Sequence, residues 1–187
     1  MLNKFVSILT LSVGFAATAH AGLIGVRTIE IKNANSDWLQ VSEFQAWNAA
    51  NVNVGLGATA SAPNTWNSSS TPDKAIDGST ATDFPNMFHE GSLGSTLTIV
   101  LASAQELMSY QIWGRSDCCS VRDVYDIWFK GVNGDTLYFA DNVSAANTDH
   151  FAAGQLPDTA NRVPEPGVLA LLGLGLSGIA FSRRKKQ

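Results

Sequence analysis

Hydrophobic and polar residues alternate over several short stretches of this chain, a pattern typical of β-strands with one buried face. Clusters of Gly, Asn, Asp and Ser separate these stretches, and no long segment between them has a convincing helical period. The pattern predicts an all-β fold, a jelly-roll β-sandwich. The expected strands are VRTIEI (26–31), WLQVSEFQAW (38–47), STLTIVL (95–101), LMSYQIWG (107–114), VYDIWFKG (124–131) and DTLYFA (135–140).

The segments between the expected strands have the composition of turns and surface loops. Asn133 and Gly134 in GVNGDT predict a hairpin turn with both residues at positive φ. Residues 58–71 are rich in Ser, Asn and Thr and predict a surface loop, and residues 142–162 predict a polar spacer. We therefore place the sandwich in residues 22–147 and a linker in residues 148–162.

The N-terminus has the features of a secretory signal. Lys4 precedes an apolar run over residues 5–17, and Ala19-His20-Ala21 matches the small-residue pattern of a cleavage site. We expect residues 1–21 to be removed before Gly22 and the protein to be exported.

The C-terminus combines a short Pro-containing motif, an apolar helix candidate over residues 167–182 and a basic end. The positive-inside rule predicts that the basic end stays cytoplasmic, with the rest of the chain across the membrane. A plain single-span anchor would have this composition. The residues concerned are Val163, Pro164, Glu165 and Pro166 in the motif and Arg183, Arg184, Lys185 and Lys186 at the end.

Residues 163–187 also resemble the PEP-CTERM sorting signal of Gram-negative bacteria. The resemblance implies recognition by an exosortase, removal of the helix near the motif, and release or attachment at the cell surface, often alongside exopolysaccharide. It implies contact with the membrane only through the terminal helix before processing.

Charge narrows the range of partners. Residues 22–162 carry seven basic and fifteen acidic side chains, a net charge of −8, which argues against binding to nucleic acid or an anionic surface. Between Lys74 and Lys130 the only cations are Arg115 and Arg122. Two isolated arginines seven positions apart suggest a local task, although ordinary surface ion pairs would give the same pattern.

The only two cysteines, Cys118 and Cys119, are adjacent, in the stretch RSDCCSVR. Export favours oxidation, but a bond between neighbours closes too small a ring to stabilise the fold by restricting the unfolded chain. It would instead make a rigid, polarizable apolar surface, suited to the apolar face of a small ligand. A structural accident, or a reduced pair that binds metal or cycles in redox chemistry, remains an alternative; adjacent cysteines fit a tetrahedral metal site poorly.

The arginines and a histidine carry a second resemblance. A guanidinium has several N–H donors in one plane, which suits it to bind sugar hydroxyls. Asp117 lies between the two arginines in the sequence and could orient one of the two guanidiniums. His89, followed by Arg115-x-Asp117 and then Arg122, resembles the signature of F-type lectins, the fucose-binding branch of the discoidin superfamily with its galactose-binding-domain-like fold. The resemblance implies that His89 and the two arginines hydrogen-bond the sugar, while a disulfide between Cys118 and Cys119 packs on its ring.

Residues 51–80 resemble the opening strand, variable loop and calcium turn of the same family. Calcium prefers about six to eight oxygen ligands, many of them backbone carbonyls. The resemblance implies a structural calcium ion bound by the carbonyls of Lys74 and Ser79 and the carboxylate of Asp77, with Asn86 in place of a hydroxyl residue.

The last calcium ligand of the family is a glutamate on the closing strand, and that strand's pattern is found here near the N-terminus, with Ser42 and Glu43 in the matching places. A circularly permuted chain could build the same site, because permutation is tolerated where termini lie close together. Alternatively, this segment is the tail of a deleted preceding repeat.

Four of the five tryptophans, Trp38, Trp47, Trp113 and Trp128, lie in strand patterns and are expected in the core or on sheet faces. Trp66 lies in the predicted loop and is the better candidate for contact with a ligand.

The sequence therefore favours a secreted or cell-surface lectin that binds fucose or a similar sugar and is stabilised by calcium. We expect no enzyme, because we find no paired carboxylates in a recognisable context, no nucleophile with a base beyond His89, and no phosphate loop. The alternative is an exopolysaccharide-matrix or adhesion protein that has no specific monosaccharide site.

Overall fold

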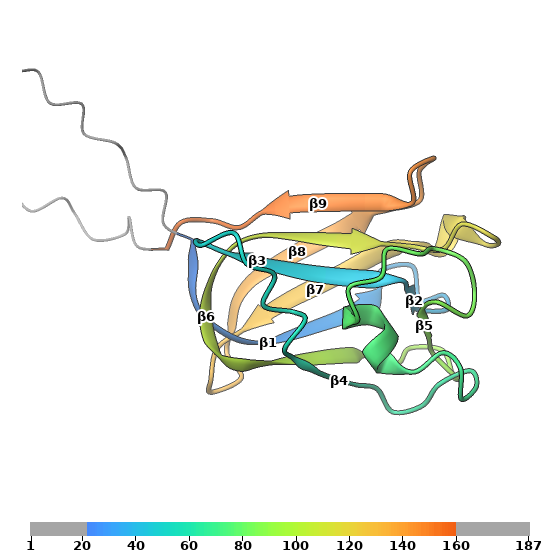
Figure 1. Ribbon diagram of the computed structural model, residues 1–187, viewed down its shortest axis with the longest axis horizontal. Helices are drawn as coiled ribbons and strands as arrows, with labels where there is room; N and C mark the ends of the chain where they lie inside the picture. Colours follow the sequence, from blue (N-terminus) through green and yellow to red (C-terminus); the bar gives the residue numbers. More distant parts are fainter. Residues whose placement is uncertain (1–21, 160–187) are drawn as a thin grey trace, which may run out of the picture.

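The structure, a computed structural model, describes residues 22–159, which form nine β-strands and two short 3₁₀ helices (Figure 1). The strands are β1 (Leu23–Asn33), β2 (Gln40–Val41), β3 (Glu43–Asn48), β4 (Thr59–Ser61), β5 (Phe88–His89), β6 (Leu97–Trp113), β7 (Val124–Lys130), β8 (Thr136–Ser144) and β9 (Phe151–Gln155), and the helices are η1 (Pro72–Ile76) and η2 (Ser120–Arg122).

Strand β6 belongs to both layers of the sandwich. Its first half pairs with β1 and β4, and β1 continues through β7 to β8. Its second half pairs with β3 on one side and β9 on the other. All these pairings are antiparallel, so the prediction of an all-β sandwich is confirmed. The two strands expected at 95–101 and 107–114 are the two halves of this one strand.

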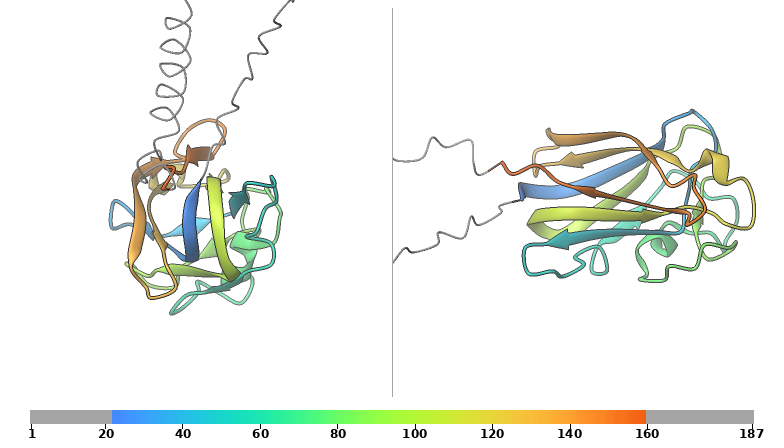
Figure 2. Two further views of the ribbon diagram at one scale, coloured as in Figure 1. Left: turned by 90° about the vertical axis from the view of Figure 1, so that its left-hand side faces the viewer. Right: turned by 90° about the horizontal axis from the view of Figure 1, so that it is seen from above.

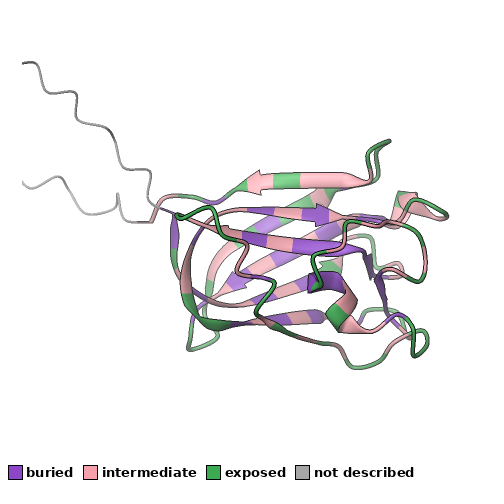
Figure 3. Ribbon diagram, in the orientation of Figure 1, coloured by how far each residue is buried: buried purple, intermediate pink, exposed green. Residues whose placement is uncertain are grey.

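The core lies between the two layers (Figure 3). In the first half of β6 the odd-numbered residues Leu97, Ile99 and Leu101 are buried, whereas in the second half the even-numbered residues Tyr110 and Ile112 are buried. Leu107, after the exposed stretch 102–104, is buried in the odd phase as well, so the change of phase falls between Leu107 and Tyr110. Large apolar side chains contribute about 1.5–3 kcal/mol each when fully buried, which is what ties the two layers together.

The structure corrects three expectations about connecting segments. The expected spacer over residues 142–162 contains the end of β8 and the whole of β9, which pairs with β6 from Ser109↔Gln155 to Trp113↔Phe151. The expected loop at 58–71 contains β4. In the hairpin turn only Gly134 has a positive φ, +83°, because a single left-handed residue suffices for this turn.

The described chain ends lie at one end of the sandwich, and the loops with the small β2–β5 sheet lie at the other. At one end Gly22 and Thr159 lie together, and the backbone N–H of Thr159 donates to the Gly22 carbonyl at 3.3 Å. The opposite end carries the small β2–β5 sheet and the loops that join β1 to β2 and β6 to β7 (Figures 1 and 2). Between residues 22 and 159 no helix has the length and apolar character needed to cross a membrane. The predicted signal and sorting segments lie outside the described residues.

Candidate functional site

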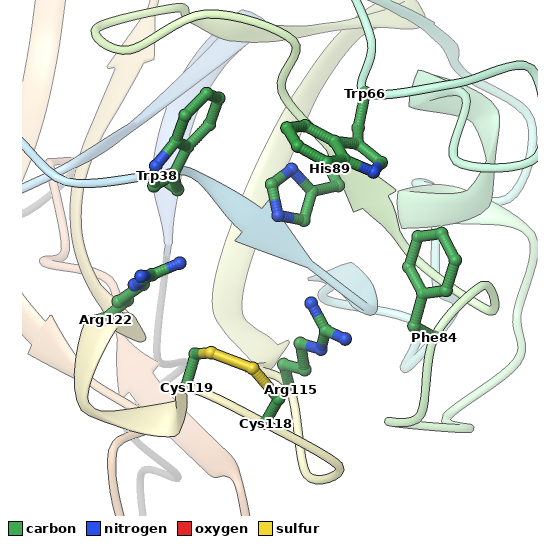
Figure 4. Close-up of a pocket in the computed structure, with 8 residues that line it drawn as sticks. All are labelled: Trp38, Trp66, Phe84, His89, Arg115, Cys118, Cys119 and Arg122. Atoms are coloured by element: carbon green, nitrogen blue, oxygen red, sulfur yellow. A yellow bond between two sulfur atoms is a disulfide. The ribbon is translucent and has the colours of Figure 1, made fainter.

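The loop end of the sandwich contains a pocket of about 330 Å³. Its lining brings together the sequence-predicted histidine, both arginines and both cysteines, although they come from two separate segments of the chain (Figure 4). The lining residues are Trp38, Trp66, Phe84, His89, Arg115, Cys118, Cys119 and Arg122.

His89 lies on β5, which pairs with β2 through Gln40↔His89. Its Nδ1 is 2.8 Å from the Glu90 carbonyl, and because a carbonyl only accepts, Nδ1 carries the hydrogen and Nε2 is left as an acceptor. Burial lowers the pKa of His89, and the positive charges of Arg115 and Arg122 lower it further against the opposing effect of Glu90. The ring is therefore neutral at physiological pH and offers one acceptor nitrogen.

Arg115 follows the end of β6 and is held from two sides. Its Nε and Nη2 donate to the two carboxylate oxygens of Asp117 at 2.7 and 3.1 Å, a bidentate pair. Its guanidinium also lies over the ring of Phe84, with Cζ 5.3 Å from the ring centroid. These contacts fix the orientation of the guanidinium and leave the N–H groups of Nη1 available to donate to a ligand.

Arg122 closes the other side of the pocket at the end of η2. Its Nε is 3.4 Å from Oδ1 of Asp37, in the loop that joins β1 to β2. The side chain of Asn33 donates to the Arg122 carbonyl, and its Oδ1 accepts from the backbone N–H of Asp37 at 3.0 Å. Each guanidinium is thus paired with a carboxylate that lies outside the pocket lining, so the pocket has fixed donors with little net charge.

Cys118 and Cys119 are joined by a disulfide bond and form part of the pocket wall. Cys119 has a left-handed backbone with φ of +61°, a conformation that is uncommon for a residue other than glycine. The turn is held by its carbonyl, which accepts from the Arg122 backbone N–H at 3.0 Å and from Nε2 of Gln40 at 3.3 Å. The two sulfur atoms therefore present an apolar surface at a fixed position between the arginines.

Asp123 anchors the loop that carries these residues. Its side chain has no exposed area, and it accepts from the Arg115 backbone N–H at 2.6 Å and from Nε2 of Gln40 at 3.0 Å. Burial raises the pKa of Asp123 to about 6, despite the opposing hydrogen bonds from Arg115, Gln40 and Tyr125. Asp123 thus holds both ends of the cysteine loop: its carboxylate binds the Arg115 backbone, and its own backbone N–H donates to the Ser120 carbonyl at 3.0 Å.

Aromatic side chains form the rest of the wall. The indoles of Trp38 and Trp66 meet edge to face at a centroid distance of 5.7 Å, and both contact the His89 ring at 5.7 and 5.5 Å. Trp66 is 58% exposed, and its backbone N–H donates to the His89 carbonyl at 2.9 Å. These contacts keep the imidazole in place and give the pocket a second apolar surface opposite the disulfide.

Sequence reasoning missed Trp38 and Phe84 as lining residues. Trp38 was expected in a strand, but it precedes β2, whose partner strand carries His89. Phe84 lies in a loop just before Pro85, outside any strand pattern, and an aromatic residue in such a place is a signal that could have found it.

The six residues implied as calcium ligands are only partly brought together. Glu43 reaches the turn after η1, where its Oε2 accepts from the Gly78 backbone N–H at 3.2 Å. Burial raises the pKa of Glu43 to about 7, and the neighbouring charge of Asp77 raises it as well. Lys74 Nζ lies 4.0 Å from Asp77 Oδ2, and Ser79 donates its backbone N–H to Asp77 Oδ1 at 2.9 Å.

The other two implied ligands bond elsewhere. The hydroxyl of Ser42 donates to the Gly114 carbonyl at 2.7 Å, and the amide of Asn86 donates to Asp83 at 3.2 Å. No group of three or more His, Cys, Asp or Glu side chains suited to a metal occurs within residues 22–159. The donor chemistry that fits calcium is therefore the pair Glu43 and Asp77 beside the backbone oxygens of the turn.

Comparison with known proteins assigns the C-terminus. Residues 162–185 match the family model described as the PEP-CTERM protein-sorting motif. The chain carries a sorting signal. Such a signal directs exosortase-dependent sorting to the cell surface or the extracellular space of Gram-negative bacteria. No curated protein and no solved structure matches the chain.

Proposed function

We propose that the sorted protein is a lectin whose pocket binds fucose or a similarly configured neutral sugar. The observation that carries the proposal is the acceptor Nε2 of His89 in one pocket with the donor guanidiniums of Arg115 and Arg122. A sugar hydroxyl both donates and accepts, so adjacent hydroxyls satisfy all three groups. A carboxylate or a phosphodiester has no hydrogen to give to Nε2.

The charge of the pocket supports the same choice. Asp117 and Asp37 already neutralise the two guanidiniums. An anionic ligand would have to compete with these carboxylates, whereas a neutral polyol uses the remaining N–H donors without separating the pairs. The disulfide and the Trp38–Trp66 wall provide apolar surfaces for the C–H groups of the ring.

Binding in this pocket involves no bond making or breaking. The neutral imidazole serves as a hydrogen-bond acceptor and the arginines as donors. The site is shallow and open to solvent, so we expect weak binding of one monosaccharide and stronger binding of clustered ligands.

We propose in addition that a calcium ion stabilises the turn that borders the sandwich. Glu43 and Asp77 would hold it together with backbone oxygens of Lys74 and Ser79. The raised pKa of Glu43 supports this, because a cation would compensate two neighbouring carboxylates of which one is buried.

Calorimetric titration of the full-length chain with L-fucose tests the sugar proposal. We expect heat of binding with the unaltered protein and no detectable binding for Arg122→Ala, because one hydrogen bond to a charged donor contributes about 1.5–3 kcal/mol and the starting affinity is weak. Lys32→Ala removes an exposed cation from the outer face of β1 and should leave the affinity unchanged. Binding by Arg122→Ala, or preference for inorganic phosphate over sugar, would show that the site is assigned wrongly.

A further inference from the structure

A second surface of the molecule has unusual composition: the outer face of the layer formed by β3, the second half of β6 and β9 (Figure 1). Alternation places Phe44, Ala46, Tyr110 and Ile112 inward, where they are buried. The side chains between them point outward. We call this surface the amide–aromatic face; it consists of Gln45, Trp47, Gln111, Trp113, Phe151 and Gln155.

Strand register sets the layout of this face. Glu43, Trp113 and Phe151 occupy one row across the three strands. In the next row Gln45 lies opposite Gln111. Three glutamines and three aromatic rings thus share one side of a three-stranded layer.

The amide–aromatic face carries no exposed charge. Within β3, β9 and residues 107–113 of β6, which pair with them, the only ionisable outward residue is Glu43, and it has no exposed area. The outer face of the larger layer is different, because Lys130 pairs with Glu30 at 2.7 Å and Lys32 lies over the ring of Trp128. A neutral face on an acidic domain does not fit a charged partner.

The amide groups on this face lie beside its aromatic rings, so the face offers both hydrogen bonds and apolar contacts. Trp47 Nε1 donates to Gln111 Oε1 at 3.3 Å, which fixes that amide and turns its Nε2 donors away from the indole. Trp113 and Phe151 pack at a centroid distance of 4.8 Å and are both partly exposed. Amides that donate and accept, beside aromatic faces, match the hydroxyl edges and C–H faces of pyranose rings.

The dimensions of the face fit a chain better than a monosaccharide. Trp47 pairs with Ser109, and Trp113 lies four residues further along β6, about 13 Å at about 3.3 Å per residue. A ligand that contacts both indoles must extend over several sugar rings.

We infer that the amide–aromatic face binds an extended, neutral polysaccharide chain, independently of the pocket. The two sites lie on different parts of the domain, since the pocket is built by loops at the end of the sandwich and this face by the side of three strands. Occupation of one leaves the other open.

Affinity electrophoresis of the full-length chain tests the inference. Native gels contain hydroxyethyl cellulose, galactomannan or xylan as neutral polymers, and alginate as an anionic one. We expect retardation by at least one neutral polymer and none by alginate, and L-fucose in the gel should not relieve it. Trp113→Ala should weaken the apparent affinity about tenfold, because it removes one stacking ring.

Two variants control for folding and for the pocket. Trp128→Ala removes an indole that is likewise packed on a phenyl ring, Phe139 at 4.8 Å, but on the other layer, and should leave retardation intact. Arg122→Ala should also leave it intact. If Trp113→Ala fails to fold, Gln111→Glu introduces a charge on the same face without removing packing and should have the same effect. No retardation by any of the three neutral polymers, retention of binding in both face variants, or concentration-dependent dimerisation through this face would overturn the inference.

Discussion

Replacing Asp123 by Asn should change how the stability of the protein depends on pH. The variant has nearly the same shape but no titratable carboxyl. In the unaltered protein, burial raises the pKa of Asp123 from 3.8 in the unfolded chain to about 6. The folded state therefore binds a proton between these two pH values that the unfolded state has already released. The contribution of this carboxyl to stability is full below about pH 3.8 and is lost as the pH rises through about 6.

The size of the effect follows from the shift. About two pKa units at about 1.4 kcal/mol each give about 3 kcal/mol. At neutral pH, Asp123→Asn gains this amount because it avoids a buried charge. It also loses about 1–3 kcal/mol, because an amide cannot accept both from the Arg115 backbone and from the Gln40 side chain without leaving one donor unpaired. At neutral pH this gain and this loss nearly cancel, so the stability of the variant at a single pH would not reveal the effect.

The measurement is therefore a pair of pH profiles. Urea unfolding of the unaltered protein and of Asp123→Asn at a series of pH values from about 4 to about 7.5 gives the difference in the free energy of unfolding. We expect that difference to shift by about 2.5 kcal/mol in favour of the variant over this range, since part of the full effect falls below about pH 4. His89 has a lowered pKa, so its contribution makes the folded state more stable as the pH rises, opposite to that of Asp123. This contribution is the same in both proteins and cancels when their free energies of unfolding are subtracted.

A control separates burial from net charge. Asp141→Asn removes the same charge from an exposed position on β8. A difference between Asp123→Asn and the unaltered protein that stays constant with pH would refute the argument, because it would mean that Asp123 titrates alike in the folded and unfolded chains.

Three further predictions concern the pocket and the calcium turn. Replacing Cys118 and Cys119 by Ser should weaken binding of L-fucose about tenfold while the urea midpoint barely moves, since the bond closes almost no chain; calorimetry and urea unfolding measure the two, and a large fall in stability would contradict this. The calcium proposal predicts a higher melting temperature of the unaltered protein with calcium than with chelator, and Glu43→Gln should abolish this rise; an equal rise in both proteins would exclude Glu43 as a ligand. Trp66→Ala should reduce sugar affinity with a change in unfolding free energy below about 1 kcal/mol, because the indole is largely exposed; unchanged affinity would remove it from the site.

The fold could be predicted from the sequence wherever a strand keeps one face buried along its length. β7 does so along its whole length, and its alternation shows it. β1 does so only in its second half, where Ile29 and Ile31 are buried, because its register with β6 shifts between Leu23 and Thr28. β6 does not, because its bend between the layers shifts the buried positions, and the sequence pattern divides it in two.

Strand β9 could not be predicted from the sequence, for a different reason. Its inward positions are small because the ring of Tyr110 fills the space beside them, and a Cβ at Gly154 would overlap that ring. A strand of Ala and Gly packed under a large partner has no hydrophobic periodicity of its own, so only the tertiary contact identifies it.

The site shows the same division. The arginines and the paired cysteines could be named from the sequence as candidates by their residue types and placement, and the resemblance to F-type lectins added the histidine and the roles of all five. Asp123 could not, because a lone aspartate before a strand is common, and only burial and the contact with Arg115 from across the loop distinguish it. Trp38 enters the pocket only through the pairing of β2 with β5.

The contact between Gly22 and Thr159 has a consequence for how the domain is displayed. Both described ends emerge together, at the end of the sandwich opposite to the loops (Figure 2), and these loops carry residues that line the pocket. A support coupled to either end, whether an envelope, a bead or a fluorescent label, stands behind the domain, and the pocket faces the surrounding medium. The pocket therefore points away from any surface that carries the domain, and a sugar bound there as proposed would come from a neighbouring surface.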